Sequence, residues 1–184
     1  MNPPLPGGKV VAFSPDGKHL AVGDGKRTVV FPAVGGPAVL DTQAQPEPPA
    51  GPTPAVVAWS PNGTRLVTSW HDPFGDALFG SDIATLQTRQ LKALIGHPAR
   101  VTAAAWSPDG KVVATGCGKG DVIVWDAETR KELKRTRIGG RGGEGLVRAL
   151  AFAPDGRTLA AAVSFDEGKN AERVVLLDTV TGNR

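Results

Sequence analysis

The side chains with the most obvious potential for chemistry in this sequence are His71, Asp72 and Asp76, which lie in one short stretch. Imidazole nitrogens and carboxylate oxygens are zinc ligands, but a structural zinc site takes four of them, and two further ligands at suitable spacing are missing. We therefore predict that this stretch is an exposed loop. We expect the chain to bind no metal and no other cofactor.

A second candidate is Cys117 with His97, because a thiol and an imidazole can form a nucleophile and its base. Cys117 falls at a position that suits a small strand residue, which favours a packed, inert thiol. As the single cysteine it excludes an intramolecular disulfide and favours a reducing compartment, so we expect a cytoplasmic protein. We predict a chain that is not an enzyme; the alternative is an enzyme with its active site in a central channel.

Two glycine-rich stretches with a lysine, residues 23–26 and 116–120, resemble phosphate-binding loops at first sight. Neither has the P-loop spacing with lysine followed by serine or threonine, and neither opens a predicted helix. We therefore reject both as phosphate sites.

The segment 130–148 is rich in positive charge, with seven basic residues against Glu132 and Glu144. Such a segment could bind an anionic ligand or nucleic acid, and the residues that would do so are Arg135, Arg137, Arg141 and Arg148. Much of it reads as an outermost strand, however, where charge ordinarily blunts a sheet edge. The net charge of +3 is too small to imply a polyanionic partner. We keep this binding as an alternative and expect no nucleic-acid partner.

These residues are positioned by an internal repeat. The aromatic residues Phe13, Trp59, Trp106 and Phe152 are separated by 46, 47 and 46 residues, and each is followed by Ser/Ala-Pro-Asp/Asn-Gly. A period of this length is typical of repeat architectures. Proline presets a turn, Asp or Asn bonds its own backbone, and glycine accepts positive φ, so each copy predicts a hairpin.

Apolar runs flank every turn, and a third β-branched run and a more polar fourth run complete a unit of four antiparallel strands. The sequence thus predicts an all-β fold of four-stranded blades, the last lacking its outer strand. The blades span about 10–42, 55–96, 97–140 and 145–184, with a proline-rich connector at 43–54 and a disordered segment at 1–9. In the second blade we expect the third strand at 77–79, with a turn at 82–85 after it.

The third repeat carries Gly96-His97, a Trp-Ser-Pro-Asp-Gly run at 106–110, Ala-Thr-Gly at 114–116 and Val-Trp-Asp at 124–126. In this order it closely resembles the WD-repeat β-propellers. The resemblance implies a hydrogen-bonded tetrad of His97, Thr115, Trp125 and an Asp, whose position Lys119 takes. The other repeats depart further, with Phe31, Ser81 and Leu177 at the tryptophan position.

The resemblance also implies a rigid platform for protein partners. In a four-stranded meander the first and third connections lie at one end of the blade. The second connection and the loop between blades lie at the other end, where the connector at 43–54, the insert at 71–76, the loop at 139–145 and the insert at 165–173 would gather. Loops of varied length on a rigid scaffold are where binding is usually built. The candidate interaction face consists of Trp70, His71, Phe74, Arg141, Phe165 and Arg173.

Four repeats are fewer than most closed relatives have, so we expect an open arc, or partial propeller. The flanks of the first and last blades would then lack neighbours, and exposed apolar surface drives association. The partner that covers them would be a second copy or the remaining blades of a longer chain. Trp59 and Trp106 should lie between blades with partners for their indole N–H groups. No apolar run is long enough to cross a membrane, and we expect no membrane association.

Overall fold

The computed structural model describes residues 10–23, 27–42, 56–71, 79–139, 145–165 and 171–181, without the side chains of 70, 71, 79–82 and 171. These residues contain fifteen strands and no helix. Since no helix occurs among them, none of them forms a helical membrane span.

The strands make four antiparallel sheets in which consecutive strands are neighbours. The first sheet holds β1 (Val10–Phe13), β2 (His19–Gly23), β3 (Thr28–Pro32) and β4 (Leu40–Asp41). The second holds β5 (Val57–Trp59), β6 (Arg65–His71), β7 (Phe79–Thr85) and β8 (Gln90–His97). The third holds β9 (Val101–Trp106), β10 (Val112–Cys117), β11 (Asp121–Asp126) and β12 (Glu132–Arg137). The fourth holds β13 (Gly145–Phe152), β14 (Thr158–Phe165) and β15 (Ala171–Asp178).

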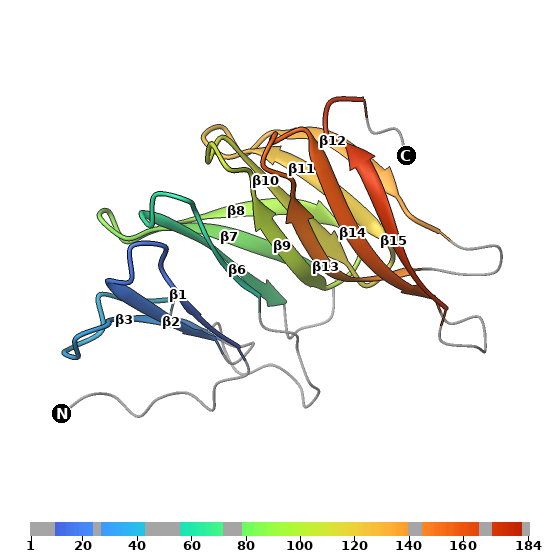
Figure 1. The fold of residues 1–184 in the computed structure, drawn as a ribbon. Coiled ribbons are helices and arrows are strands. Elements are labelled where there is room, and N and C mark those ends of the chain that lie inside the picture. Colours follow the sequence, from blue (N-terminus) through green and yellow to red (C-terminus); the bar gives the residue numbers. More distant parts are fainter. Residues whose placement is uncertain are drawn as a thin grey trace.

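Figure 1 shows the four sheets side by side in chain order, from the blue first sheet to the red fourth sheet. Their first strands contact one another in succession, β1 with β5, β5 with β9, and β9 with β13. This is the arrangement of propeller blades around an axis, so the predicted all-β architecture is confirmed. The last blade has three strands among the described residues, as expected.

The first connection of every blade is a five-residue turn, at 14–18, 60–64, 107–111 and 153–157. In the first blade the Ser14 hydroxyl donates to Asp16 Oδ1 at 2.6 Å and accepts the His19 N–H at 3.0 Å. Gly17 provides the positive φ of 70° that the turn requires. We call the end of the molecule that carries these turns the turn end, and the opposite end, with the second connections, the loop end.

Neighbouring blades are joined by the tryptophans of the repeat. The Trp59 indole N–H donates to the Ala12 carbonyl oxygen at 3.0 Å, and that of Trp106 to the Ala58 carbonyl oxygen at 2.9 Å. Both tryptophans therefore lie between blades with partners for their N–H groups, as predicted. Phe152 holds the same position in the fourth blade and packs on the core without a donor.

The predicted bounds of the third strand in the second blade, 77–79, are wrong. The strand is β7, Phe79–Thr85, so the predicted turn at 82–85 lies inside it. The aromatic residue of β5 pairs with Leu66 and Leu66 with Ala84, just as Trp106 pairs with Val113 and Val113 with Trp125. Ala84, and not Ser81, thus takes the tryptophan position. The true turn precedes Gln90, with Arg89 at φ 54° matching Arg130 at φ 61° in the third blade.

Strand pairing also shortens the insert that we placed at 165–173. β14 continues to Phe165 and β15 begins at Ala171, and these two residues are register partners. The expected disorder of 1–9 and the connector at 43–54 lie outside the described residues.

Candidate functional site

The three side chains that the resemblance assigned to a tetrad meet in the third blade. His97 ends β8, Thr115 lies on β10 and Trp125 on β11. Thr115 Oγ1 lies 2.6 Å from His97 Nε2 and accepts the Trp125 indole N–H at 2.7 Å. All three residues are buried. The cluster joins the outer strand of one blade to the middle strands of the next and has a structural character.

The family resemblance assigns an aspartate as the fourth member of the tetrad, and this chain has Lys119 at that position. His97 accordingly lacks one hydrogen bond. Its Nδ1 is buried and has no hydrogen-bond partner in the structure. Burial lowers the pKa of His97 to about 4, and the nearby positive charge of Arg135 acts in the same direction. His97 is therefore a neutral imidazole at physiological pH.

Cys117 does not form a catalytic pair with His97. Its side chain is fully buried, and burial raises the pKa of the thiol. His97 Nε2 is instead engaged by Thr115. A protonated, buried thiol is a poor nucleophile, so the structure favours the packed role.

Within the described residues no group of three metal-ligating side chains gathers. Asp72 and Asp76 lie outside these residues, and the side chain of His71 is not described. The candidate fragment at 71–76 thus stays a sequence hypothesis.

The basic segment forms internal ion pairs. Arg135 binds Glu132 through two nitrogens, at 3.1 and 2.7 Å. Arg135 and Arg137 both reach the buried carboxylate of Asp121, each at 3.3 Å. Arg148 donates to the Ser164 hydroxyl at 3.0 Å, and Arg141 lies outside the described residues. Three of the four arginines considered for anion binding therefore already have partners in the fold.

Arg65, which was not predicted from the sequence as a functional residue, links two blades at the turn end. Its guanidinium donates to the Ala127 carbonyl oxygen at 3.2 Å and lies 5.3 Å from the centre of the Trp106 ring. It also lies 3.4 Å from Glu128. The only feature of the sequence that could have indicated this role is the position of Arg65, directly after the repeated turn and one residue before the apolar run of β6.

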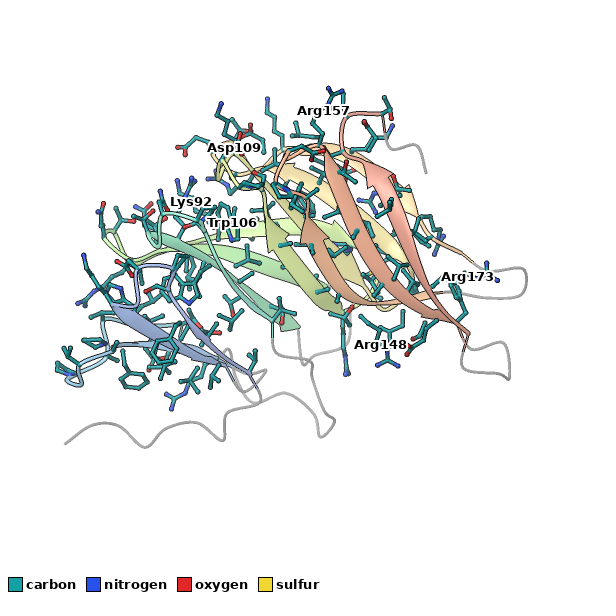
Figure 2. The ribbon with its side chains drawn as sticks, viewed as in Figure 1. Lys92, Trp106, Asp109, Arg148, Arg157 and Arg173 are labelled. Atoms are coloured by element: carbon teal, nitrogen blue, oxygen red, sulfur yellow. The ribbon has the colours of Figure 1, made fainter. Side chains whose placement is uncertain are left out.

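The residues proposed for the interaction face have different surroundings. The prediction that Phe165 belongs to the interaction face is wrong, because this residue is only 4% exposed and packs in the core between the third and fourth blades. Arg173 is exposed, and its guanidinium lies 5.4 Å from the Phe165 ring centre, so it covers that ring. Figure 2 shows Arg148 and Arg173 well away from Asp109 and Arg157 of the turn end. Phe74 and Arg141 lie outside the described residues, and the side chains of Trp70 and His71 are not described.

Comparison with known proteins identifies a family. The model of the WD domain, G-beta repeat, matches residues 88–126. Centriole proteome protein 16 of Chlamydomonas reinhardtii is 31% identical over an alignment of 167 residues, and the match covers 69% of this chain and 8% of that protein. The rat ribosome biogenesis protein BOP1 is 29% identical over 89 residues, 48% of this chain and 11% of that protein. Protein HIR1 of Cryptococcus neoformans var. neoformans serotype D is 29% identical over an alignment of 115 residues, and the match covers 56% of this chain and 13% of that protein.

Among solved structures, Kuenenia stuttgartiensis hydrazine synthase superposes with a TM-score of 0.72 at 19% identity, over 99% of this chain and 49% of that chain. Identity this low shows a shared fold alone. The chain spans about a tenth of the length of the curated relatives named above.

Proposed function

We propose that this chain, which belongs to the WD-repeat β-propellers, is a non-catalytic scaffold that binds protein partners at its loop end. Two of its relatives, the ribosome biogenesis protein BOP1 and Centriole proteome protein 16, carry the names of large assemblies. On that likeness the scaffold would work within a multi-protein assembly. Because Cys117 is a buried free thiol, we propose that the protein resides in a reducing compartment, the cytoplasm.

The observation that carries the proposal is the contrast between the two ends of the blades. Every first connection has five residues, whereas the second connections cover 24–27, 72–78, 118–120 and 166–170. Uniform turns are a requirement of the repeat itself. Connections that vary on a constant scaffold are the usual place for partner-specific contacts.

The aspartate carboxylates at the turn end form hydrogen bonds within their own turns. Asp16 and Asp109 each accept a serine hydroxyl and a lysine backbone N–H, and these hydrogen bonds hold the pKa of both carboxyl groups below the usual value. Asp155 accepts the backbone N–H groups of Arg157 and Thr158, with the same effect on its pKa. Acceptors that are engaged in this way have less capacity for a partner.

At the loop end of the third blade, backbone hydrogen bonds hold the short connection in place. The Gly118 N–H donates to the Arg100 carbonyl oxygen at 3.0 Å, and the Ile138 N–H to the Gly120 carbonyl oxygen at 2.8 Å. A connection fixed to its neighbours presents a defined surface. A partner binding there loses less affinity to the ordering of flexible segments.

A capture experiment with matched charge reversals tests the proposal. Arg141→Glu with Arg173→Glu alters the loop end, and Lys18→Glu with Lys111→Glu alters the turn end. Proteins captured from the source cell by the wild type and by the turn-end variant, but lost with the loop-end variant, would support the proposal. Loss with the turn-end variant alone would contradict it. Circular dichroism of each variant verifies that the fold is intact.

A further inference from the structure

The outer strands of the two middle blades, β8 and β12, are sheet edges. Each is the last strand of its sheet, and among the described residues each pairs with one strand only, β8 with β7 and β12 with β11 (Figure 1). An edge strand presents a row of backbone N–H and C=O groups with which a further strand can pair. Proteins ordinarily protect such an edge with charged side chains or with a β-bulge.

β12 has both kinds of protection, and β8 has little of either. Four of the six residues of β12 are charged, and its register with β11 shifts so that Leu133 has no partner. In β8, Lys92 is the one Lys, Arg, Asp or Glu among eight residues. The register of β8 with β7 is unbroken from Gln90 to Ile95. β8 is therefore a regular edge that is open to pairing.

Three apolar side chains are exposed along one face of this edge. Leu91, Ala93 and Ile95 alternate along β8, so they project from the same face of the sheet. Leu91 is 43% and Ile95 is 61% exposed, and Ala93 is also exposed. Leu91 pairs with Ala84, and Ala84 pairs with Leu66 in the core between the first and second blades. The exposed face thus continues an apolar interface that is already buried.

This face is exposed because the outer strand of the first blade is short. β4 has two residues, whereas β8 has eight, so β4 cannot cover the length of β8. On the corresponding face of β12 the side chains are Arg135 and Arg137, which pair with Ile123 and Asp121. The second blade therefore has apolar side chains where the third has arginines. Exposed apolar side chains beside an open backbone edge mark an interaction site.

The charges around β8 have one sign. From residue 85 to residue 100 the sequence contains Arg89, Lys92 and Arg100 and neither aspartate nor glutamate. Lys92 is exposed, and it pairs with Ile83, so it projects from the face opposite to Leu91. A second copy that paired through the same edge would bring these like charges together, which is unfavourable. Acidic groups would instead be attracted.

We infer that β8 is a docking edge for an extended segment of a partner protein in which apolar and acidic residues alternate. The segment adds a fifth strand to the four of the second blade through backbone hydrogen bonds. Its apolar side chains cover Leu91, Ala93 and Ile95, and its acidic side chains lie on the other face beside Lys92. This edge is separate from the loop end, so the inference does not depend on a partner there.

Two synthetic peptides of eight residues, the length of β8, test the inference on the full 184-residue chain. One peptide alternates valine with glutamate, and its control alternates valine with lysine. Fluorescence anisotropy of the labelled peptides measures binding. We expect the glutamate peptide to bind at least about tenfold more tightly than the lysine peptide. No binding of the glutamate peptide, or equal binding of the two peptides, would overturn the inference.

Single substitutions locate the binding site on β8. Ile95→Thr removes apolar surface but keeps a β-branched residue, and it should weaken binding of the glutamate peptide by about tenfold. Lys92→Glu should weaken the glutamate peptide and strengthen the lysine peptide. Leu133→Thr, at a 54% exposed position of β12, is the matched control and should leave binding unchanged. An equal loss in Leu133→Thr and Ile95→Thr would overturn the inference.

Methylation of the peptide's backbone nitrogens tests whether it binds as an added strand. In an added strand alternate N–H groups point toward β8, and the others point toward solvent. One peptide is therefore methylated at every valine nitrogen and a second at every glutamate nitrogen. We expect one of the two modifications to abolish binding and the other to leave it intact. Any other pattern would contradict the added strand.

Sedimentation velocity of the chain without peptide tests a second copy as the occupant of the edge. We expect the Ile95→Thr variant to sediment like the wild type, because the edge is free in the absence of a partner. A wild-type dimer that this substitution reduces to the 19.0 kDa monomer would assign the edge to a second copy and overturn the inference.

Discussion

The indole N–H of Trp106 donates a 2.9 Å hydrogen bond to the carbonyl oxygen of Ala58, across the interface between the second and third blades. Trp106→Phe keeps an aromatic ring beneath Arg65 and removes the donor. We expect a loss of about 1–2 kcal/mol of unfolding free energy, because a partly buried acceptor loses its partner. Urea denaturation measures this loss. Trp59→Phe, which removes the equivalent bond to Ala12, should behave alike; unchanged stability in both variants would argue against the bond as a link between blades.

Trp125 should matter more than the residue at its position in the fourth blade. Trp125→Ala removes a large buried side chain and the hydrogen bond to Thr115 together, and we expect a cost of about 3–5 kcal/mol. Leu177→Ala removes a smaller apolar side chain with no hydrogen bond. Equilibrium denaturation compares the two variants, and an equal or larger loss for Leu177→Ala would disprove the structural weight given to the tetrad.

The lowered pKa of His97 makes stability dependent on pH. In the unfolded chain the imidazole binds a proton below about pH 6.5, whereas in the fold it stays neutral down to about pH 4. Stability therefore decreases as the pH falls from 6.5 toward 4, by roughly 3 kcal/mol for a shift of this size. Denaturation midpoints at pH 7 and pH 4.5 measure the effect. His97→Gln has no titrating group there, so an undiminished decrease in that variant would point to another residue.

The family resemblance assigns Lys119 to the position of the tetrad carboxylate, and His97 Nδ1 is unpartnered in the structure. Lys119→Asp should supply an acceptor to that nitrogen and so raise both the melting temperature and the pKa of His97. Lys119→Ala, which removes the lysine without adding a carboxylate, is the matched control. A lower melting temperature for Lys119→Asp than for this control would contradict the assignment of the position.

The repeat explains why so much of the fold could be predicted. The Ser-Pro-Asp-Gly turn defines the first hairpin of each blade to the residue, since serine, aspartate and glycine each have a specific role in it. The turn also forms without the serine hydroxyl. In the fourth blade Ala153 takes the serine position, and the Thr158 N–H donates to Asp155 Oδ1 in place of a serine oxygen. Local chemistry of this kind is visible in a sequence.

Longer-range register was harder to predict. Asp82 to Thr85 has the Asp-x-x-Thr pattern of the genuine turn at Asp126, whose carboxylate accepts the Thr129 N–H and hydroxyl. In β7 the same pattern is strand, because Ala84 must pair with Leu66 for the blade to keep its core. Phe165 looked like an exposed insert residue because the continuation of β14 depends on pairing with Ala171, which the sequence does not reveal.

The most direct test of the central claim, that partners bind at the loop end, is hydrogen exchange of the chain with and without a captured partner. We predict slower amide exchange at Gly118 and Gly120 and in the strand residues next to the other second connections, with unchanged exchange in the turns at 14–18, 60–64, 107–111 and 153–157. Protection confined to those turns would contradict the claim.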